Sequence, residues 1–194
     1  PETARRFGFG LDAFKRANPS LRHQQSIPAG TMIFLPHLVI VPDIKPNSIT
    51  VNTAEKRLYY HHKPSQTLFV WPIGIGRLDH ATPEGTRYVT RKRINPTWHV
   101  TPEGLAEAYS LGYSDHPKVV PPGPTNPLGS HAINLSQGNY LIHSTNRSQS
   151  IGTRNTSGCI NMYPEDIAEL FEILPLQTAV SIIKHPIKMI LTPT

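Results

Sequence analysis

Cysteine is almost absent from this chain: among 194 residues, only Cys159 carries a thiol. A single cysteine excludes an internal disulfide and leaves two interpretations, a buried inert thiol or a reactive one. Long apolar runs are also lacking. The longest candidate, IFLPHLVIVP, is broken by prolines and falls short of the roughly 18 residues of a membrane span. We therefore expect a globular chain without a transmembrane segment.

Acidic residues are few as well. The chain has 13 Asp and Glu residues against 19 Lys and Arg residues, which gives a net charge of +6 at pH 7. A basic protein favours anionic partners such as nucleic acid, anionic lipid or an acidic cell-wall polymer. The basic residues form tight groups only at 4–6 and 91–93, and no aromatic side chains alternate with them. This pattern favours a solvated basic surface over nucleic-acid binding.

Strands and turns are favoured by what the chain does contain, 20 prolines and 13 glycines. The stretch 101–129 is rich in proline, so we predict that it is irregular and serves as a lid or binding loop. Segments with alternating or β-branched residues predict strands in 48–53, 56–62, 66–76, 86–94, 131–136, 139–144 and 178–186.

One helix is expected directly after the cysteine. Pro164 fits its first position, acidic residues follow in the first turn, and Pro175 stops it. Its buried face follows the helical spacing of Ile167, Leu170, Phe171 and Leu174. The fold class expected from the residues is therefore mainly β, with one helix after the cysteine loop.

The chain divides into four segments. Residues 1–36 predict two short helices followed by a turn and a strand in 27–36, a core so small that it must pack on something else. Residues 37–46 are rich in proline and predict a stiff linker. Residues 47–185 form the predicted β domain, and 186–194 form a C-terminal tail.

The surroundings of the thiol bear on its chemistry. Cys159 follows Ser157 and Gly158 and lies downstream of His143, which ends an apolar strand. A histidine within hydrogen-bond reach and the positive end of the helix at Pro164 would favour a thiolate, so we expect a lowered thiol pKa. The turn at Gly158 would expose backbone N–H groups that stabilise an oxyanion, and together these features predict acyl transfer through a thioester. The alternative from spacing alone is a small buried cysteine at a loop-to-helix junction.

Several sequence motifs carry a family resemblance. IHS at 142–144 and IGTRNTSGCINM at 151–162 closely resemble the signature of the L,D-transpeptidase (YkuD-type) catalytic domain, and VWPIGIG, TPEGTRYVT, NPTW and VPPGPTNPLG resemble the same family in the same order. The resemblance covers 47–185. Residues 1–36 resemble the later part of a LysM glycan-binding module, whose usual opening strand is missing ahead of the first helix.

The resemblance implies a β-sandwich-like catalytic domain that acts on peptidoglycan. Such an enzyme cleaves a tetrapeptide stem after its third residue and releases D-Ala. The acyl group then passes to an acceptor that the sequence leaves open: an amine of another stem peptide, as a 3→3 cross-link, the lysine of an envelope lipoprotein, water or a free D-amino acid. It would be exported to the periplasm or cell envelope, although this chain shows no signal peptide, and carbapenems would acylate it. No metal or organic cofactor is implied.

The resemblance also assigns roles to individual residues. It makes Cys159 the nucleophile and His143 the general base, with the carbonyl of Ser144 orienting the imidazole. Backbone N–H groups near Ser157, Gly158 and Cys159 would form the oxyanion hole.

Four further residues are candidate substrate contacts. Arg154 and Asn161 would bind substrate carboxylates or hold the loop, Trp98 would line the cleft and Tyr113 would act from the lid. The histidines show no paired metal-ligand spacing, so no metal site is predicted. A catalytically silent peptidoglycan-binding protein is the alternative, and a papain-type peptidase is disfavoured because its cysteine precedes its histidine.

Overall fold

One curved sheet dominates the structure. The computed structural model describes residues 1–37 and 39–189, in which eight strands follow the order β11-β9-β8-β5-β12-β1-β2-β3. These strands are β1 Ile49–Asn52, β2 Arg57–His62, β3 Thr67–Pro72, β5 Gly85–Ile94, β8 His131–Leu135, β9 Leu141–His143, β11 Ile160–Asn161 and β12 Ala179–Ile183. Every predicted strand of the β domain is therefore present, and the mainly β fold class is confirmed.

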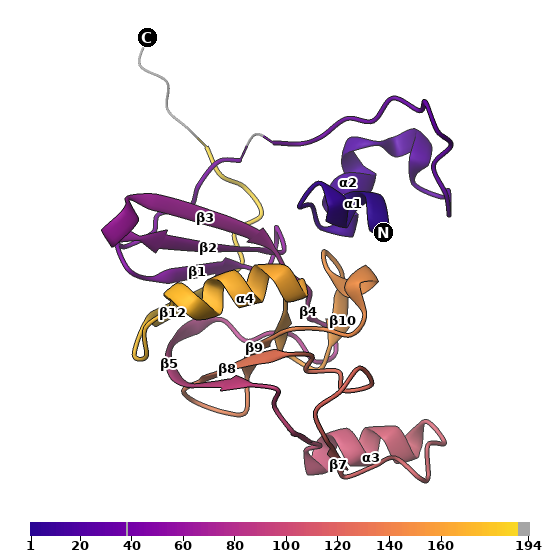
Figure 1. Ribbon diagram of the computed structural model, residues 1–194, viewed down its shortest axis with the longest axis vertical. Helices are drawn as coiled ribbons and strands as arrows, with labels where there is room; N and C mark the ends of the chain where they lie inside the picture. The colour runs from indigo at the N-terminus through magenta and orange to yellow at the C-terminus, as the bar shows by residue number, and fades with distance from the viewer. Residues whose placement is uncertain (38, 190–194) are drawn as a thin grey trace.

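Helix α4 (Pro164–Ile173) lies between the two halves of this sheet, which curls around it (Figure 1). Ile167, Leu170 and Phe171 are buried as predicted, and the helix ends ahead of Pro175. Their side chains join those of β1, β2, β5, β8, β9 and β12 in one hydrophobic core. Because α4 follows β11 directly, the packing of the helix in this core also anchors the strand that comes after Cys159.

Two small strand pairs lie outside the main sheet. β4 (Ile75–Gly76) pairs in parallel with β10 (Arg154–Thr156), the strand that leads to Cys159. β6 (Trp98–His99) pairs with β7 (Val119–Val120) and closes the base of the segment between β5 and β8.

That segment, 95–129, contains a helix that the prediction of an irregular stretch missed. Helix α3 (Pro102–Ser110) begins with proline at its first position, and the Thr101 hydroxyl accepts a hydrogen bond from the Gly104 N–H at 3.1 Å. A threonine followed by proline and glutamate is a helix-start signal, so this element could have been found. We call residues 95–129 the lid.

The base of the lid is held by one buried amide. The Asn126 side chain, which is fully buried, donates to the carbonyls of Pro96, Val120 and Pro121 at 2.9–3.2 Å. Its oxygen accepts from the Leu128 N–H at 2.9 Å. A buried amide with all of these bonds satisfied fixes both ends of the lid to each other.

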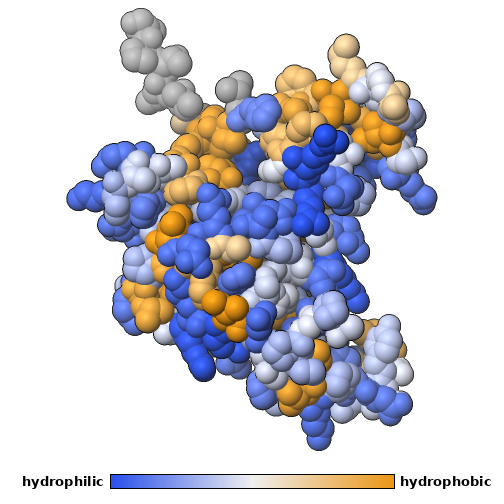
Figure 2. Space-filling view, in the orientation of Figure 1, coloured by the Kyte–Doolittle hydropathy of each residue, from blue (hydrophilic) through white to orange (hydrophobic). Residues whose placement is uncertain are grey.

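The N-terminal module, residues 1–36, forms the two predicted short helices, α1 (Glu2–Arg6) and α2 (Leu11–Ala17). The strand predicted in 27–36 is wrong for the described residues. There, the Asn18 amide bonds with the N–H and carbonyl of Phe34 at 2.7 and 2.9 Å, so a side chain replaces a neighbouring strand. Apolar surface gathers over this module (Figure 2), where Met32 and Phe34 are exposed.

The division of the chain into module, linker, β domain and tail stays a prediction. Residue 38 of the predicted linker and residues 190–194 of the predicted tail lie outside the described residues. In the part of the chain that is described, no helix has the length and apolar character needed to cross a membrane.

Candidate active site

Strand register brings the cysteine loop beside the histidine. β11 runs parallel to β9, with Ile160 opposite Ile142 and Asn161 opposite His143. The two isoleucines point into the core, so His143 and Asn161 occupy the other face of the sheet. Because side chains alternate along a strand, Cys159, two residues before Asn161, is placed on the same face as His143.

The His143 side chain is held in one orientation. It is only 6% exposed, and its Nδ1 donates a hydrogen bond to the Ser144 carbonyl at 2.5 Å. A carbonyl can only accept, so Nδ1 carries the proton and Nε2 keeps its lone pair. Burial lowers the pKa of His143 to about 4, with the bond to Ser144 acting in the opposite direction. At neutral pH the imidazole is therefore neutral, with Nε2 free to accept a proton.

Burial and a nearby carbonyl set the environment of the Cys159 thiol. Its Sγ lies 4.0 Å from the Asn139 carbonyl, beside the start of β9. Burial raises the pKa of the Cys159 thiol, and a hydrogen bond with the Leu141 backbone only partly opposes this. The lowered thiol pKa expected from the sequence is therefore wrong for the resting protein.

The sequence predicts that the N-terminus of α4 lowers the pKa of Cys159, but this end of the helix contacts the N-terminal module. β11 separates Cys159 from α4, and the first turn of α4 instead faces the N-terminal module, where Glu165 pairs with Arg5 at 2.9 Å. Since the effect of a helix end falls off within a turn, it does not reach the thiol. The pKa shifts of the two groups, lowered for His143 and raised for Cys159, favour the neutral form of each at neutral pH, so we expect ionisation to accompany reaction.

The turn before the thiol offers hydrogen-bond donors. Gly158 has φ = +100°, a conformation that side chains rarely adopt, and a Cβ there would lie 2.9 Å from Cε1 of Tyr140. Among the described residues, the N–H groups of Ser157, Gly158 and Cys159 make no hydrogen bond. Three unpaired donors beside a nucleophile are suited to stabilise a developing oxyanion.

Arg154 and Asn161 contact the protein's own loops. Arg154 lies on β10 and donates to the Gly76 carbonyl at 3.3 Å. Asn161 is buried and donates to the Ser150 hydroxyl at 2.9 Å, while its backbone exchanges two hydrogen bonds with Gly74. Of the two roles that the sequence left open for them, the observed contacts are those that hold the loop.

Trp98 and Tyr113 both belong to the lid. Trp98 packs edge-on against His116 with ring centroids 5.8 Å apart, and Tyr113 is 63% exposed beyond the end of α3. Within the described residues, neither shares a hydrogen bond or ring contact with the cysteine loop. The structure does not bring these two candidates to Cys159.

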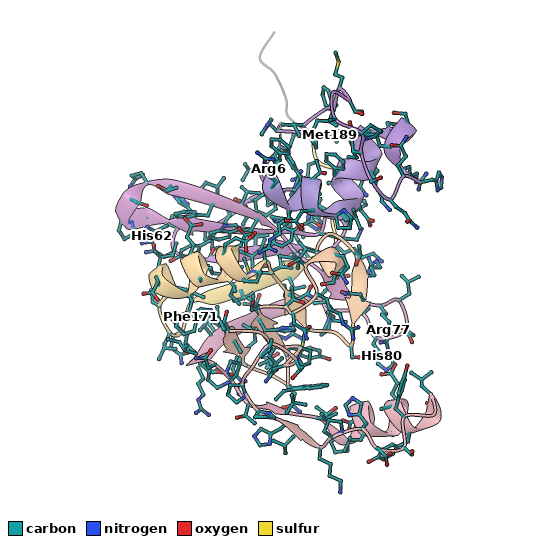
Figure 3. All side chains as sticks on the ribbon, turned by 45° about the vertical axis from the view of Figure 1, so that its right-hand side comes forward. Arg6, His62, Arg77, His80, Phe171 and Met189 are labelled. Atoms are coloured by element: carbon teal, nitrogen blue, oxygen red, sulfur yellow. The ribbon has the colours of Figure 1, made fainter. Side chains whose placement is uncertain are left out.

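Two features of the site were missed by sequence reasoning. Tyr140 abuts Gly158, and the buried Arg87 guanidinium lies 5.2 Å from its ring centroid, a cation–π contact that supports the cysteine turn from behind. Arg77 pairs with Glu107 of α3 and with Asp79, and so joins the lid to the loop after β4; Figure 3 shows Arg77 and His80 on the side that faces α3. No spacing in the sequence signals either contact, because both join distant segments.

Comparison with known proteins identifies the family. The family model described as the L,D-transpeptidase catalytic domain, YkuD, matches residues 46–182. The chain therefore belongs to the YkuD family of L,D-transpeptidases. Within the residues that the structure describes, no group of three or more candidate ligands for a metal ion occurs.

Individual relatives agree with this assignment. The chain is 40% identical over 192 residues to the probable L,D-transpeptidase YbiS of Escherichia coli, covering 98% of this chain and 61% of that protein. The chain thus spans about three fifths of the length of this relative.

Solved structures share the fold. The carbamoyl enzyme formed by Ldtfm and avibactam superposes with a TM-score of 0.56 at 21% identity, covering 73% of this chain and 50% of that one. A faropenem-derived adduct of L,D-transpeptidase 3 from Mycobacterium tuberculosis superposes with a TM-score of 0.52 at 16% sequence identity. The match covers 71% of this chain and 60% of that one.

Gly129, at the end of the lid, supports the carbonyl that orients His143. A Cβ at Gly129 would lie 2.6 Å from the Cβ of Ser144, which is fully buried. We expect Gly129→Ala to displace Ser144, tilt the imidazole and lower kcat by about 10- to 100-fold, as a misplacement of about 1 Å can do. Steady-state kinetics and thermal unfolding would measure the two effects.

Gly112→Ala is the matched control. Both glycines have a positive φ, +62° at Gly129 and +88° at Gly112, but a Cβ at Gly112 meets nothing within 4 Å. Both variants should lose about 1–2 kcal/mol of stability to backbone strain, whereas only Gly129→Ala should lose kcat. Equal kcat values in the two variants would show that Gly129 has no part in orienting His143.

Proposed function

We propose that this chain is a cysteine-dependent L,D-transpeptidase that acts on peptidoglycan tetrapeptide stems. The single observation that carries the proposal is the arrangement of His143. Its Nδ1 is held by Ser144, which leaves the Nε2 lone pair as the base on the face of the sheet that Cys159 shares.

The first half-reaction forms a thioester. As Nε2 of His143 takes the thiol proton, Sγ of Cys159 attacks the carbonyl carbon of the third stem residue, and the carbonyl oxygen becomes an oxyanion. Unpaired N–H groups of Gly158 and its neighbours lie beside Sγ and would stabilise that charge. When the intermediate collapses, the C–N bond to D-Ala breaks, and the imidazolium returns its proton to the departing amine.

The second half-reaction transfers the acyl group. An acceptor amine attacks the thioester carbonyl, His143 accepts the amine proton, and the thiolate leaves and is reprotonated. The acceptor is the amine of a second stem peptide, which gives a 3→3 cross-link, or the lysine of an envelope lipoprotein. No metal or organic cofactor takes part, and nucleic acid is not a partner.

The remaining assignments belong to this proposal. The protein would act in the periplasm or cell envelope, where peptidoglycan is found, and the net charge of +6 favours an acidic wall polymer. Arg154 and Asn161 would support the loop and contact substrate, Trp98 and Tyr113 would contact it from the lid, and the LysM-like module would add modest binding to the wall.

Mass analysis of products tests the proposal. Incubation with a purified disaccharide tetrapeptide should release D-Ala and yield cross-linked dimers, or a conjugate when a lysine peptide is added. A carbapenem or faropenem should add one molecule per chain, and peptide mapping should locate it on Cys159. Peptidoglycan binding without D-Ala release or adduct would instead identify a catalytically silent binding protein.

A further inference from the structure

Backbone contact joins the N-terminal module to the turn that precedes β10. The Leu11 N–H donates to the Ile151 carbonyl at 3.0 Å. A Cβ at Gly10 would lie 2.8 Å from the Gly152 Cα, and a Cβ at Gly152 would lie 2.3 Å from the Leu11 nitrogen. Only glycine at both positions permits this approach. The module therefore packs on residues 148–153 in one closely defined position.

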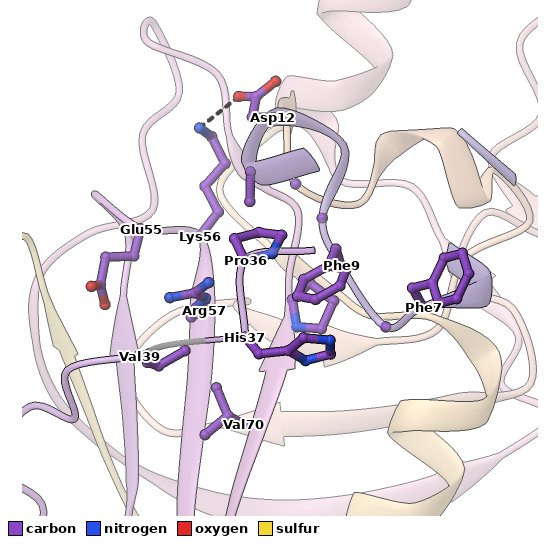
Figure 4. Close-up of a pocket in the computed structure, with 15 residues that line it drawn as sticks. Phe7, Phe9, Asp12, Pro36, His37, Val39, Glu55, Lys56, Arg57 and Val70 are labelled. Carbon is purple, nitrogen blue, oxygen red and sulfur yellow. Dashed lines mark hydrogen bonds and ion pairs between the residues drawn. The ribbon is translucent and has the colours of Figure 1, made fainter. Parts of the chain in front are cut away.

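Side chains surround this contact. Lys56 pairs with Asp12 at 2.7 Å beside the cavity shown in Figure 4, which the module and strands β2 and β3 line together. The Tyr163 hydroxyl, which is buried, donates to the Phe9 carbonyl at 3.1 Å. The backbone contact, the part-buried ion pair and the buried hydroxyl together fix the orientation of the module.

The turn that receives the module also holds the strand after Cys159. Ser150 ends a short helical turn, Ser148–Ser150, directly before Ile151, and its hydroxyl accepts the buried hydrogen bond from Asn161 at 2.9 Å. Asn161 lies opposite His143 in the register of β9 and β11. A continuous series of contacts therefore runs from Leu11 through the 148–153 turn to the strand that fixes the position of Cys159.

We propose that the N-terminal module is a positioning element of the transferase site, acting through the contact of Gly10 and Leu11 with the 148–153 turn. The inference rests on the proposed function, in which Cys159 and His143 are the reacting groups. The module then sets the geometry of catalysis, in addition to any contact that it makes with the cell wall.

Leu11 offers a sharp test, because it is the first residue of α2. Proline is well tolerated at that position, and Gly10 already has the extended conformation that a following proline requires, φ −70° and ψ 148°. Leu11→Pro removes the N–H donor and the leucine side chain and places the ring Cδ against the Ile151 carbonyl, whereas Leu11→Ala removes the side chain and keeps the donor. We expect kcat for D-Ala release to be about 10- to 100-fold lower in Leu11→Pro than in Leu11→Ala, with KM within about twofold.

Two further variants keep the test decisive. Gly10→Ala adds one methyl group against Gly152 without backbone strain and should lower kcat in the same way, whereas Ala29→Val, at an exposed position of the same module, should not. Ser150→Ala should also lower kcat. In the double variant with Leu11→Pro, Ser150→Ala should lower kcat little further, because both substitutions interrupt the same series of contacts.

The rate at which iodoacetamide alkylates Cys159 distinguishes a failure of the proposed function from a failure of the positioning role. It reports on the environment of the thiol and needs no peptide substrate. If the wild-type chain releases no D-Ala but alkylation differs between Leu11→Pro and Leu11→Ala, the proposed function fails and the positioning role stands. If kcat and alkylation are equal in the folded Leu11→Pro, Gly10→Ala and Leu11→Ala variants, the positioning role is overturned.

Discussion

Replacing Cys159 by serine should reduce D-Ala release by more than about 10³-fold. A hydroxyl is much less acidic than a thiol, and a neutral imidazole with a pKa of about 4 is a weak base that cannot ionise it efficiently. The rest of the site would be unchanged, since the exchange of sulfur for oxygen alters only the reacting atom. Release of D-Ala measured under saturating substrate would give the ratio directly.

Cys159→Ala is the companion variant. It should lose turnover to the same extent and form no adduct with a carbapenem, while thermal unfolding and peptidoglycan sedimentation remain close to those of the wild-type chain. The side chain lies in a loop at the edge of the core, so its loss leaves packing intact. Substantial D-Ala release by Cys159→Ala would overturn the assignment of the nucleophile.

His143→Ala should slow acylation by about 10²–10⁴-fold, the usual effect of losing a general base. The wild-type rate should be nearly constant from pH 8 down to about pH 5 and fall only as the imidazole gains a proton near its pKa of about 4. In His143→Ala the rate should instead rise with pH, because only the thiolate reacts and burial raises the pKa of the Cys159 thiol. Single-turnover acylation measured across pH would distinguish the two profiles.

Stability provides an independent check on the state of His143. Its pKa is lowered in the folded chain, so the unfolded chain takes up the proton first as pH falls below about 6.5. The folded state then loses about 1.4 kcal/mol per pH unit down to the folded pKa, and His143→Ala should lack this slope. An acid limb of the activity near pH 6.5, together with the same stability slope in the wild-type and His143→Ala chains, would contradict a buried neutral imidazole.

The sequence predicted what depends on local pattern. Alternation located the strands, and the spacing of Ile167, Leu170 and Phe171 located the buried face of α4. The pairing of Cys159 with His143 came from resemblance to a family, because the fifteen intervening residues carry no information about strand register. The register of β9 and β11 supplies that information in the structure.

The errors share a physical cause, which is that their outcome depends on tertiary contacts. The thiol pKa was expected to fall, yet burial by surrounding segments raises it. The extended residues near Phe34 read as a strand, but the amide of Asn18 takes the hydrogen bonds that a neighbouring strand would make. Helix α3 is different, since its start signal at Thr101 and Pro102 was present in the sequence.

A raised thiol pKa also bears on chemical damage. Oxidants such as hydrogen peroxide attack thiolates, and sensitivity follows thiolate character and exposure. Cys159 is the only cysteine of the chain, so no neighbouring thiol could capture a sulfenic acid before it advanced to the irreversible sulfinic state. Under the proposed mechanism the sulfur ionises only during attack on a carbonyl, and we therefore expect Cys159 to react slowly with peroxide.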